Sequence, residues 1–480
     1  MRVSDYFRLN RSQPTLDFVD VDIHGDLRVF VDPRALRLLP STWATRCVSL
    51  IQDFFHHVLR QIQSGRNHDA EQLLRSLREP NETHLGLSRH RARGHALGQD
   101  SAYNVWHSLQ YSQAVRSGLL EDLEDTILMV EGIAADIVSD ITTNIIREPL
   151  IEYTQSICQK YLIPLTPDID SGPLWDAQSH SWDSRYVPLP VAEEKKLLLV
   201  PKAIIRRRMD YDVGEYYRDY LLSALQDAEL SANSELVQLL KNGTRRVTKK
   251  SIREKYGYGK RMIVQQTRNH PEVLDRYRED KRRSIQPPME HEEVAVEEQE
   301  SPPDWNQLIQ TVQGIAPGPA AANNFQRAVE DMLTALFYPE LVYPVSEQPI
   351  HRGRKRIDIT FTNMATTGFF KWLAQHYQAA HVFVECKNYN ADPANPELDQ
   401  LAGRFSETRG QFGLLVCRKL IDRELFMERC RDTARDHRGF IIPLDDDDLH
   451  TLVAERQTKG ANRREPAPGL LRDRFNDLVM

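Results

Sequence analysis

Cysteine is scarce in this chain: five residues among 480, far apart and without any C-x-x-C pair. An odd number of widely spaced cysteines argues against a disulfide framework and against a structural zinc site. None of the 16 histidines forms an H-E-x-x-H or similar ligand pair, so no zinc enzyme is indicated. We therefore expect the chain to fold in a reducing compartment, the cytoplasm.

Long apolar runs and an excess of positive charge are also missing. No stretch of about 18 apolar residues occurs, and the start of the chain, MRVSDYFRLN, has no apolar signal core. We expect no membrane segment. The 62 Lys and Arg against 69 Asp and Glu give a formal net charge of −7. Contact with nucleic acid would therefore have to come from a local basic surface.

The domain organisation is indicated by one change in composition. Residues 284–304 (SIQPPMEHEEVAVEEQESPPD) are acidic, carry prolines at both ends and lack aromatics. This composition predicts a disordered linker between an N-terminal module, 1–283, and a second module, 305–455. The polar tail 456–480 is expected to be loosely held. Within the N-terminal module, the loop-rich stretch 164–194 marks a further candidate boundary.

The N-terminal module is predicted to be mainly α-helical, of the α+β class. Residues 43–63 carry apolar side chains at helical spacing, and 101–161 and 212–230 continue in the same way. Periodicity breaks in 79–100, where three arginines and three glycines could cradle a phosphate. The alternative is a solvated loop. The candidate ligand residues of this loop are Arg89, Arg91 and Arg93.

The densest basic stretch is 241–261 (KNGTRRVTKKSIREKYGYGKR), with nine Lys and Arg. Thr248 could cap a short helix over 249–256, and Gly257 and Gly259 would turn the chain into a second helix from residue 260. Two short basic helices suit phosphate-backbone binding, although such runs are also common as solvated helix faces. The candidate nucleic-acid contacts here are Arg245, Arg246, Lys249, Lys250, Arg253, Lys260 and Arg261.

Two predicted strands carry the chemistry of the second module. In 356–361 (RIDITF) the isoleucines and Phe361 alternate with Asp358, as in a half-buried strand. In 381–387 (HVFVECK) the period of two places Glu385 and Lys387 on one face at the strand end. If the strands are neighbours, Asp358 joins them. Two carboxylates can hold Mg²⁺ beside a substrate phosphate, and the lysine can orient a water or stabilise the transition state.

Asp358 followed by Glu385-Cys386-Lys387 resembles the D…(D/E)xK signature of the PD-(D/E)xK, or restriction-endonuclease-like, nuclease superfamily. The resemblance covers about residues 323–453, and N-terminal residues 1–283 resemble no family that we recognise. It implies an α/β domain with a central mixed sheet and Mg²⁺-dependent cleavage of DNA, with Mn²⁺ able to substitute. It also implies that Asp358, Glu385 and the backbone carbonyl of Cys386 bind the metal and that Lys387 serves catalysis.

Neighbouring helices supply further candidates through the same resemblance. Such nucleases usually carry an acid on the helix here predicted over 324–337, but the expected position holds Gln326, so Glu330 one turn later is the candidate ligand. On a predicted helix over 396–405, Gln400 corresponds to a glutamine near the scissile phosphate, and Arg404 is a candidate DNA contact. Strands over 412–417 and 439–443 and helices over 422–435 and 446–456 complete the expected α/β order.

These patterns predict a multidomain Mg²⁺-dependent DNA endonuclease, a bacterial restriction or antiphage defence effector in which the N-terminal module senses or assembles. DNA is the expected substrate, with RNA as an alternative, and a homodimer, a larger assembly or a partner defence protein would fit double-strand cutting. Two rivals remain open. One is a catalytically inactive nuclease fold that binds nucleic acid or acts as a scaffold. The other is a DNA-binding regulator acting through 241–261.

Overall fold

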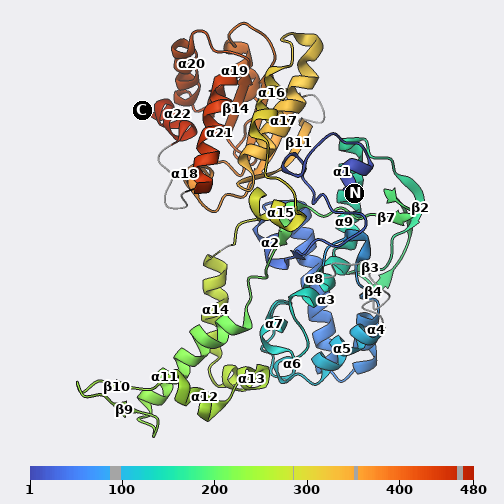
Figure 1. Cartoon of the computed structure of the whole chain (residues 1–480), viewed down its shortest axis with the longest axis vertical. Coiled ribbons are helices and arrows are strands. Elements are labelled where there is room, and N and C mark those ends of the chain that lie inside the picture. Colours follow the sequence, from blue (N-terminus) through green and yellow to red (C-terminus); the bar gives the residue numbers. More distant parts are fainter. Residues whose placement is uncertain (87–98, 285, 351–354, 462–468) are drawn as a thin grey trace.

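The computed structural model of the chain describes residues 1–86, 99–284, 286–350, 355–461 and 469–480. It shows an α+β protein, about half helical, with an N-terminal helical region and a C-terminal five-stranded mixed sheet (Figure 1). Within these ranges, no helix is long and apolar enough to cross a membrane.

The N-terminal body is a set of helices around α3, whose apolar stripe is buried as its spacing predicts. The expected helical stretch 101–161 is interrupted and forms five helices. Pro149 lies in the first turn of α9, where a missing backbone N–H costs no helical hydrogen bond. The helices are α1 (Val3–Tyr6), α2 (Pro33–Leu38), α3 (Thr42–Gln63), α4 (Asn67–Arg75), α5 (Gln99–Gln110), α6 (Gln113–Arg116), α7 (Asp125–Met129), α8 (Ala135–Ile145) and α9 (Arg147–Tyr161).

The N-terminal body also contains short β-strands. The loop-rich stretch 164–194 folds into small antiparallel pairs, with Trp175 packed edge-on against Phe54 of α3. Its indoles therefore belong to the core of the body, and the stretch is no boundary between separate cores. The strands are β1 (Phe30–Val31), β2 (Thr166–Asp170), β3 (Leu174–Asp176), β4 (Ser181–Asp183), β5 (Tyr186–Leu189), β6 (Val191–Ala192), β7 (Lys195–Lys196) and β8 (Ile205–Arg206).

Residues 213–283 project from the body, and we call this segment the arm (Figure 1). Thr248 accepts a hydrogen bond from the Ser251 amide and caps α12, and Gly257 and Gly259 have φ of +83° and +106°, so the predicted helix–turn–helix is confirmed. The arm contains α10 (Val213–Glu215), a π-helical turn (Tyr216–Leu221), α11 (Leu222–Ser231), β9 (Gln238–Leu239), β10 (Arg245–Arg246), α12 (Lys249–Tyr256), α13 (Lys260–Asn269) and α14 (Pro271–Arg283).

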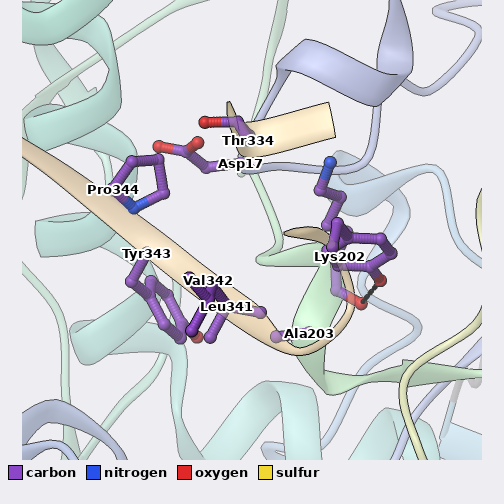
Figure 2. Close-up of a pocket in the computed structure, with 9 residues that line it drawn as sticks. Asp17, Lys202, Ala203, Thr334, Leu341, Val342, Tyr343 and Pro344 are labelled. Carbon is purple, nitrogen blue, oxygen red and sulfur yellow. Dashed lines mark hydrogen bonds between the residues drawn. The ribbon is translucent and has the colours of Figure 1, made fainter. Parts of the chain in front are cut away.

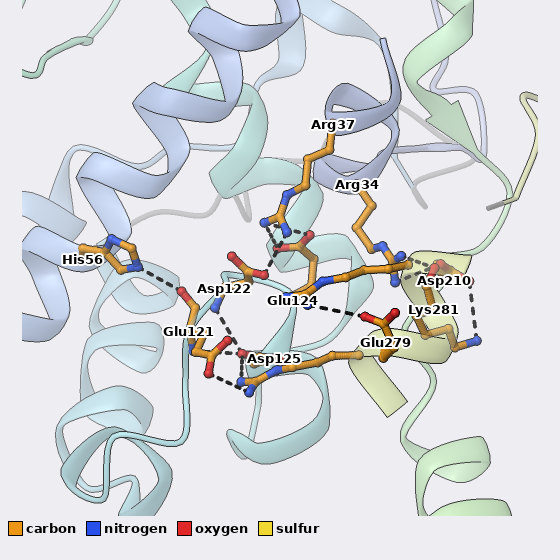
Figure 3. A network of polar contacts seen from close by, with 12 residues as sticks. Arg34, Arg37, His56, Glu121, Asp122, Glu124, Asp125, Asp210, Glu279 and Lys281 are labelled. Carbon is orange, nitrogen blue, oxygen red and sulfur yellow. Dashed lines mark hydrogen bonds and ion pairs between the residues drawn. The ribbon is translucent and has the colours of Figure 1, made fainter. Parts of the chain in front are cut away.

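Buried ion pairs fix the root of the arm to the body (Figure 3). Arg278 of α14 lies 2.5 Å from the Asp125 carboxylate of α7, and both side chains are buried. Lys281 of α14 contacts Asp210 at 3.4 Å, which in turn pairs with Arg34 of α2 at 3.0 Å. Because these charges are desolvated, separating the arm from the body would leave uncompensated charges in the protein interior.

The C-terminal region is built on the sheet, in the order β11-β12-β13-β14-β15. The pairs β11–β12 and β12–β13 are antiparallel, and β13, β14 and β15 run parallel to one another. The strands are β11 (Leu341–Ile350), β12 (Lys355–Asn363), β13 (His381–Lys387), β14 (Phe412–Cys417) and β15 (Phe440–Leu444). The helices are α15 (His291–Glu298), α16 (Trp305–Gln313), α17 (Ala322–Phe337), α18 (Gly368–His376), α19 (Asn395–Ala402), α20 (Arg423–Arg435), α21 (Asp446–Ala461) and α22 (Leu470–Val479).

Two predicted loose segments are instead packed. The expected linker contains α15, and His291 on it is buried within hydrogen-bond distance (2.8 Å) of the Ala335 carbonyl. The expected tail contains α22, whose Phe475 is buried among aromatic rings of the sheet and α18. Both predictions relied on composition, and both failed because a few apolar side chains at helical spacing were enough for docking.

A polar interface joins the two regions. Lys160 of α9 lies 2.8 Å from Glu330 of α17 and 2.9 Å from Asp17, and it also donates to the Pro344 carbonyl of β11. Beside it is a cavity of about 10 Å³, the volume one water needs, lined by Asp17, Thr334 and Tyr343 among others (Figure 2). Val342 of β11 belongs to the apolar core of the N-terminal body, and the adjacent Leu341 belongs to the core of the C-terminal region, so the two cores meet at β11.

Substituting Lys160 tests this interface. Lys160→Met leaves the buried carboxylates of Asp17 and Glu330 without their cation, and we expect the free energy of unfolding to fall by about 3–5 kcal/mol. Urea denaturation of this variant and of Lys371→Met, which replaces an exposed lysine of α18, measures the difference. A loss of less than about 1 kcal/mol for Lys160→Met, no larger than that of a surface substitution, would contradict the inference that Lys160 compensates two buried carboxylates.

Candidate functional site

The candidate site lies where β12 and β13 meet. Ile359 pairs with Val384 in the antiparallel register. The next residues outward, Asp358 and Glu385, are therefore neighbours across the two strands. This confirms the prediction that the strands are adjacent and that the aspartate joins the E-x-K end of β13.

Glu385, Lys387 and Gln400 form a closed triangle of polar contacts. The Glu385 side chain is 1% exposed, and its Oε1 accepts a hydrogen bond from Lys387 Nζ at 2.9 Å. Gln400 of α19 donates from its amide nitrogen to the same Oε1 and accepts from Lys387 Nζ at 3.0 Å through its own oxygen. The other Glu385 oxygen, Oε2, is buried and has no hydrogen-bond partner among the described residues.

Asp358 lies half-buried beside this triangle, and its Oδ2 accepts a hydrogen bond from the Cys386 amide at 2.8 Å. Burial first, and then the negative charge of Glu385, raise the pKa of Asp358 to about 6. The Cys386 amide and Lys387 act in the opposite direction. The two carboxylates therefore repel each other and share one nearby ammonium group.

This donor set fits a hard divalent cation. A cation near Glu385 Oε2 would give that buried oxygen a partner and relieve its repulsion with Asp358. Among the residues that the structure describes, no group of three or more His, Cys, Asp or Glu side chains is arranged to hold a metal. Two carboxylates are nevertheless enough for Mg²⁺ when water and substrate phosphate complete the octahedron.

The neighbouring helix α17 places Gln326, and not Glu330, against the site. Gln326 Nε2 donates to the Asp358 carbonyl oxygen at 3.0 Å. Glu330 is buried one turn later, where Lys160 and the Ser346 hydroxyl bind its two oxygens at 2.8 and 2.5 Å. In this arrangement the carboxylate expected to ligate the metal belongs to the interface with the N-terminal region.

Cys386, Arg404 and the candidate phosphate loop have separate outcomes. The side chain of Cys386 packs against the core, where burial raises its thiol pKa far above the usual range. Arg404, expected to contact DNA, is only 9% exposed and so lies mostly inside the fold. The candidate phosphate loop with Arg89, Arg91 and Arg93 lies outside the described residues.

The basic candidates lie on the arm, away from the sheet (Figure 1). Contrary to the prediction, the ammonium group of Lys260 is bound within the fold and is not available to a nucleic acid. Its Nζ donates to the Val130 and Ile133 carbonyls at 2.7 Å, just beyond the end of α7, and burial lowers its pKa to about 8. Lys260 therefore anchors α13 to the body.

Sequence reasoning missed a pair beside the site. The Tyr389 hydroxyl donates to Glu397 Oε1 at 2.7 Å, and Glu397 Oε2 accepts from the Ala394 amide at the start of α19. Burial and the hydrogen bond to Glu397 raise the pKa of Tyr389, and the hydrogen bonds from Tyr389 and the Ala394 amide outweigh burial and lower the pKa of Glu397. This pair fixes the first turn of α19 and hence Gln400, one turn later. The capping position of Glu397 in its helix was the available signal.

Comparison with known proteins adds one finding. The family model for a domain of unknown function, DUF8370, matches residues 8–212. This segment covers the helical body and ends before the arm, so it includes none of Asp358, Glu385 and Lys387. No curated protein and no solved structure matches the chain.

The raised pKa of Asp358 predicts a stability effect. Because its folded-state pKa of about 6 exceeds the usual 3.8, the ionised carboxyl destabilises the fold above about pH 6. The penalty disappears below about pH 4, where both states are protonated. We expect Asp358→Asn to raise the free energy of unfolding at pH 7 by about 1–3 kcal/mol and to have little effect near pH 4.

Chemical denaturation at the two pH values measures this difference, with the exposed Glu407→Gln as the control. If the Asp358→Asn protein is less stable than the parent at pH 7, the ionised carboxylate stabilises the fold and the prediction is wrong.

Proposed function

We propose that the chain is a Mg²⁺-dependent endonuclease that hydrolyses DNA phosphodiesters. The convergence of Asp358, Glu385, Lys387 and Gln400 at the end of β12 and β13 carries this proposal. An ion pair that only stabilised the end of the strand would require Glu385 and Lys387 alone. A second buried carboxylate beside them raises the electrostatic cost, which is typical of a functional site.

The side chains divide the work as follows. Asp358 and Glu385 hold the ion through their carboxylates. When bound, the ion lowers the pKa of a water and neutralises charge on the phosphate oxygens. The Lys387 ammonium, which donates to Glu385 and Gln400, would stabilise negative charge that develops on the phosphate oxygens. Gln400 holds Lys387 in place through its side-chain oxygen, and Gln326 supports the backbone at Asp358.

The large N-terminal region supports a wider biological role. A nuclease site joined to a region of unknown function through a buried ion-paired interface fits a bacterial restriction or antiphage defence effector acting in the cytoplasm. Cutting both strands of a duplex requires two such sites. A homodimer, a larger assembly or a partner protein would provide them.

A second candidate function is nucleic-acid binding without cleavage. The observation that favours it is the helix position near the site, where Gln326 stands and Glu330 is held by Lys160. A site with two carboxylates alone would bind a divalent ion less tightly than one with three.

A plasmid-nicking assay separates these functions. Pure protein with Mg²⁺ should convert supercoiled plasmid to nicked or linear forms, and EDTA should abolish the reaction. We expect Lys387→Ala to lower the nicking rate at least about 100-fold, because the site loses the ammonium group that stabilises charge on the phosphate.

The control is Lys371→Ala on α18, which removes an exposed lysine and should leave the rate unchanged. Nicking that persists in Lys387→Ala would contradict the assigned site. A protein that retains plasmid in a gel-shift assay with no metal-dependent nicking would support the binding function in its place.

A further inference from the structure

The tip of the arm has a charge opposite to that of the rest of the chain. Residues 241–261 contain nine Lys and Arg and one acidic residue, Glu254, within a chain of net charge −7. Concentrated like charges repel one another, so such a surface is favoured when an anionic partner offsets the repulsion. The question is how many of these cations the fold already uses.

The structure separates structural cations from exposed ones. Lys255 pairs with Glu229 at 2.6 Å, and Lys260 donates to carbonyls near the end of α7, so both hold the arm together. Lys250 behaves differently, because its side chain is 86% exposed and meets Glu254 only at 3.8 Å. Arg246 on β10 and Arg261 at the start of α13 are also exposed.

The exposed cations of α12 lie on one side of that helix. At 100° per residue, Lys250 and Arg253 lie about 60° apart and at least about 100° from the fully buried Ile252, whereas Lys249 lies nearer Ile252 and its Nζ donates to the Arg218 carbonyl at 2.5 Å. Tyr258, in the turn between α12 and α13, is 74% exposed and packs edge-on against Tyr217. Tyrosine side chains are among those that donate hydrogen bonds to phosphate oxygens in protein–DNA complexes, so Tyr258 fits beside these cations.

The arm presents this surface rigidly. Its own core buries Tyr216, Tyr217 and Tyr277, and the Tyr217 hydroxyl donates to the Gly257 carbonyl in the turn beside Tyr258. At its root, Arg278 and Asp125 form the buried pair described above. A rigid projection loses little conformational entropy when it binds, which favours a docking role over a freely moving loop.

We propose that the tip of the arm binds the phosphate backbone of duplex DNA, through Arg246, Lys250, Arg253 and Arg261 and with Tyr258 beside them, without reading base sequence. The choice of DNA rests on the proposed function. The tip and the sheet lie at opposite ends of the molecule (Figure 1). The arm therefore holds the substrate at a distance from Lys387 and raises its local concentration at the site.

The test measures binding of a fluorescent DNA duplex to the full chain by anisotropy, in EDTA so that no cleavage occurs. The variant Arg246→Gln/Lys250→Gln/Arg261→Gln removes three exposed cations that the fold does not use. We expect its affinity to fall at least about 10-fold. The slope of log affinity against log salt should become shallower by about 0.9 for each lost phosphate contact.

The matched control is Arg276→Gln/Arg282→Gln/Arg283→Gln, which removes the same charge from exposed positions of α14 near the root. This control should retain the affinity of the parent. Equal binding by the two triple variants overturns the inference. Tighter binding of duplex RNA than of DNA, or strong preference for one DNA sequence, overturns it as well.

The result is independent of catalysis. If the parent binds DNA through the arm in EDTA but never nicks it with Mg²⁺, the inference stands and the endonuclease function fails. If the parent nicks DNA and the arm variant binds and nicks as the parent does, the function stands and the inference fails.

Discussion

The repulsion between Asp358 and Glu385 is the constraint on which the C-terminal site depends. The strand register places the two carboxylates side by side, and the fold buries Glu385 fully and Asp358 in part. Among the described residues, Lys387 alone places an ammonium group within hydrogen-bond distance of Glu385, and Gln400 holds it there. Without a further cation the pair stays strained, as the raised pKa of Asp358 records. Strain of this kind is what a site that takes up a divalent ion would show.

Helix α17 connects this site to the N-terminal region. At one position its Gln326 supports the backbone of Asp358, and one turn later its Glu330 is bound by Lys160. The adjacent Asp331 pairs with Arg11 at 3.0 Å. Two neighbouring carboxylates of α17 therefore form ion pairs with cations of the N-terminal region. A displacement of that region would therefore act directly on the helix beside the site.

The elements with strong local patterns could be predicted from the sequence. Apolar and polar residues alternate along β12, β13 ends in a charged pair, and α3 has a continuous apolar stripe. Thr248 marks the start of α12, and two glycines mark the turn after it. Asp358, Glu385 and Lys387 follow from β12 and β13, whereas Gln400 was indicated by the resemblance to a nuclease superfamily, and the structure places all four together.

Elements whose stability comes from distant partners could not be predicted. Strand β11 contains Pro344 and Pro349, which argue against a strand, yet it lies at the sheet edge where proline is tolerated. Helix α15 looked like a linker because its composition does not reveal that His291 docks against α17. The roles of Glu330 and Lys260 depend on residues far away in the chain, Lys160 and the end of α7, which local periodicity does not reveal.

The most direct test of the site is a crystal structure of the protein grown with Mn²⁺, whose anomalous scattering locates the ion. We expect an anomalous peak about 2.1–2.2 Å from carboxylate oxygens of both Asp358 and Glu385, with Lys387 Nζ still beside Glu385. A structure with no ion there at millimolar Mn²⁺, and with the Asp358 and Glu385 carboxylates unchanged, would contradict the metal-dependent site.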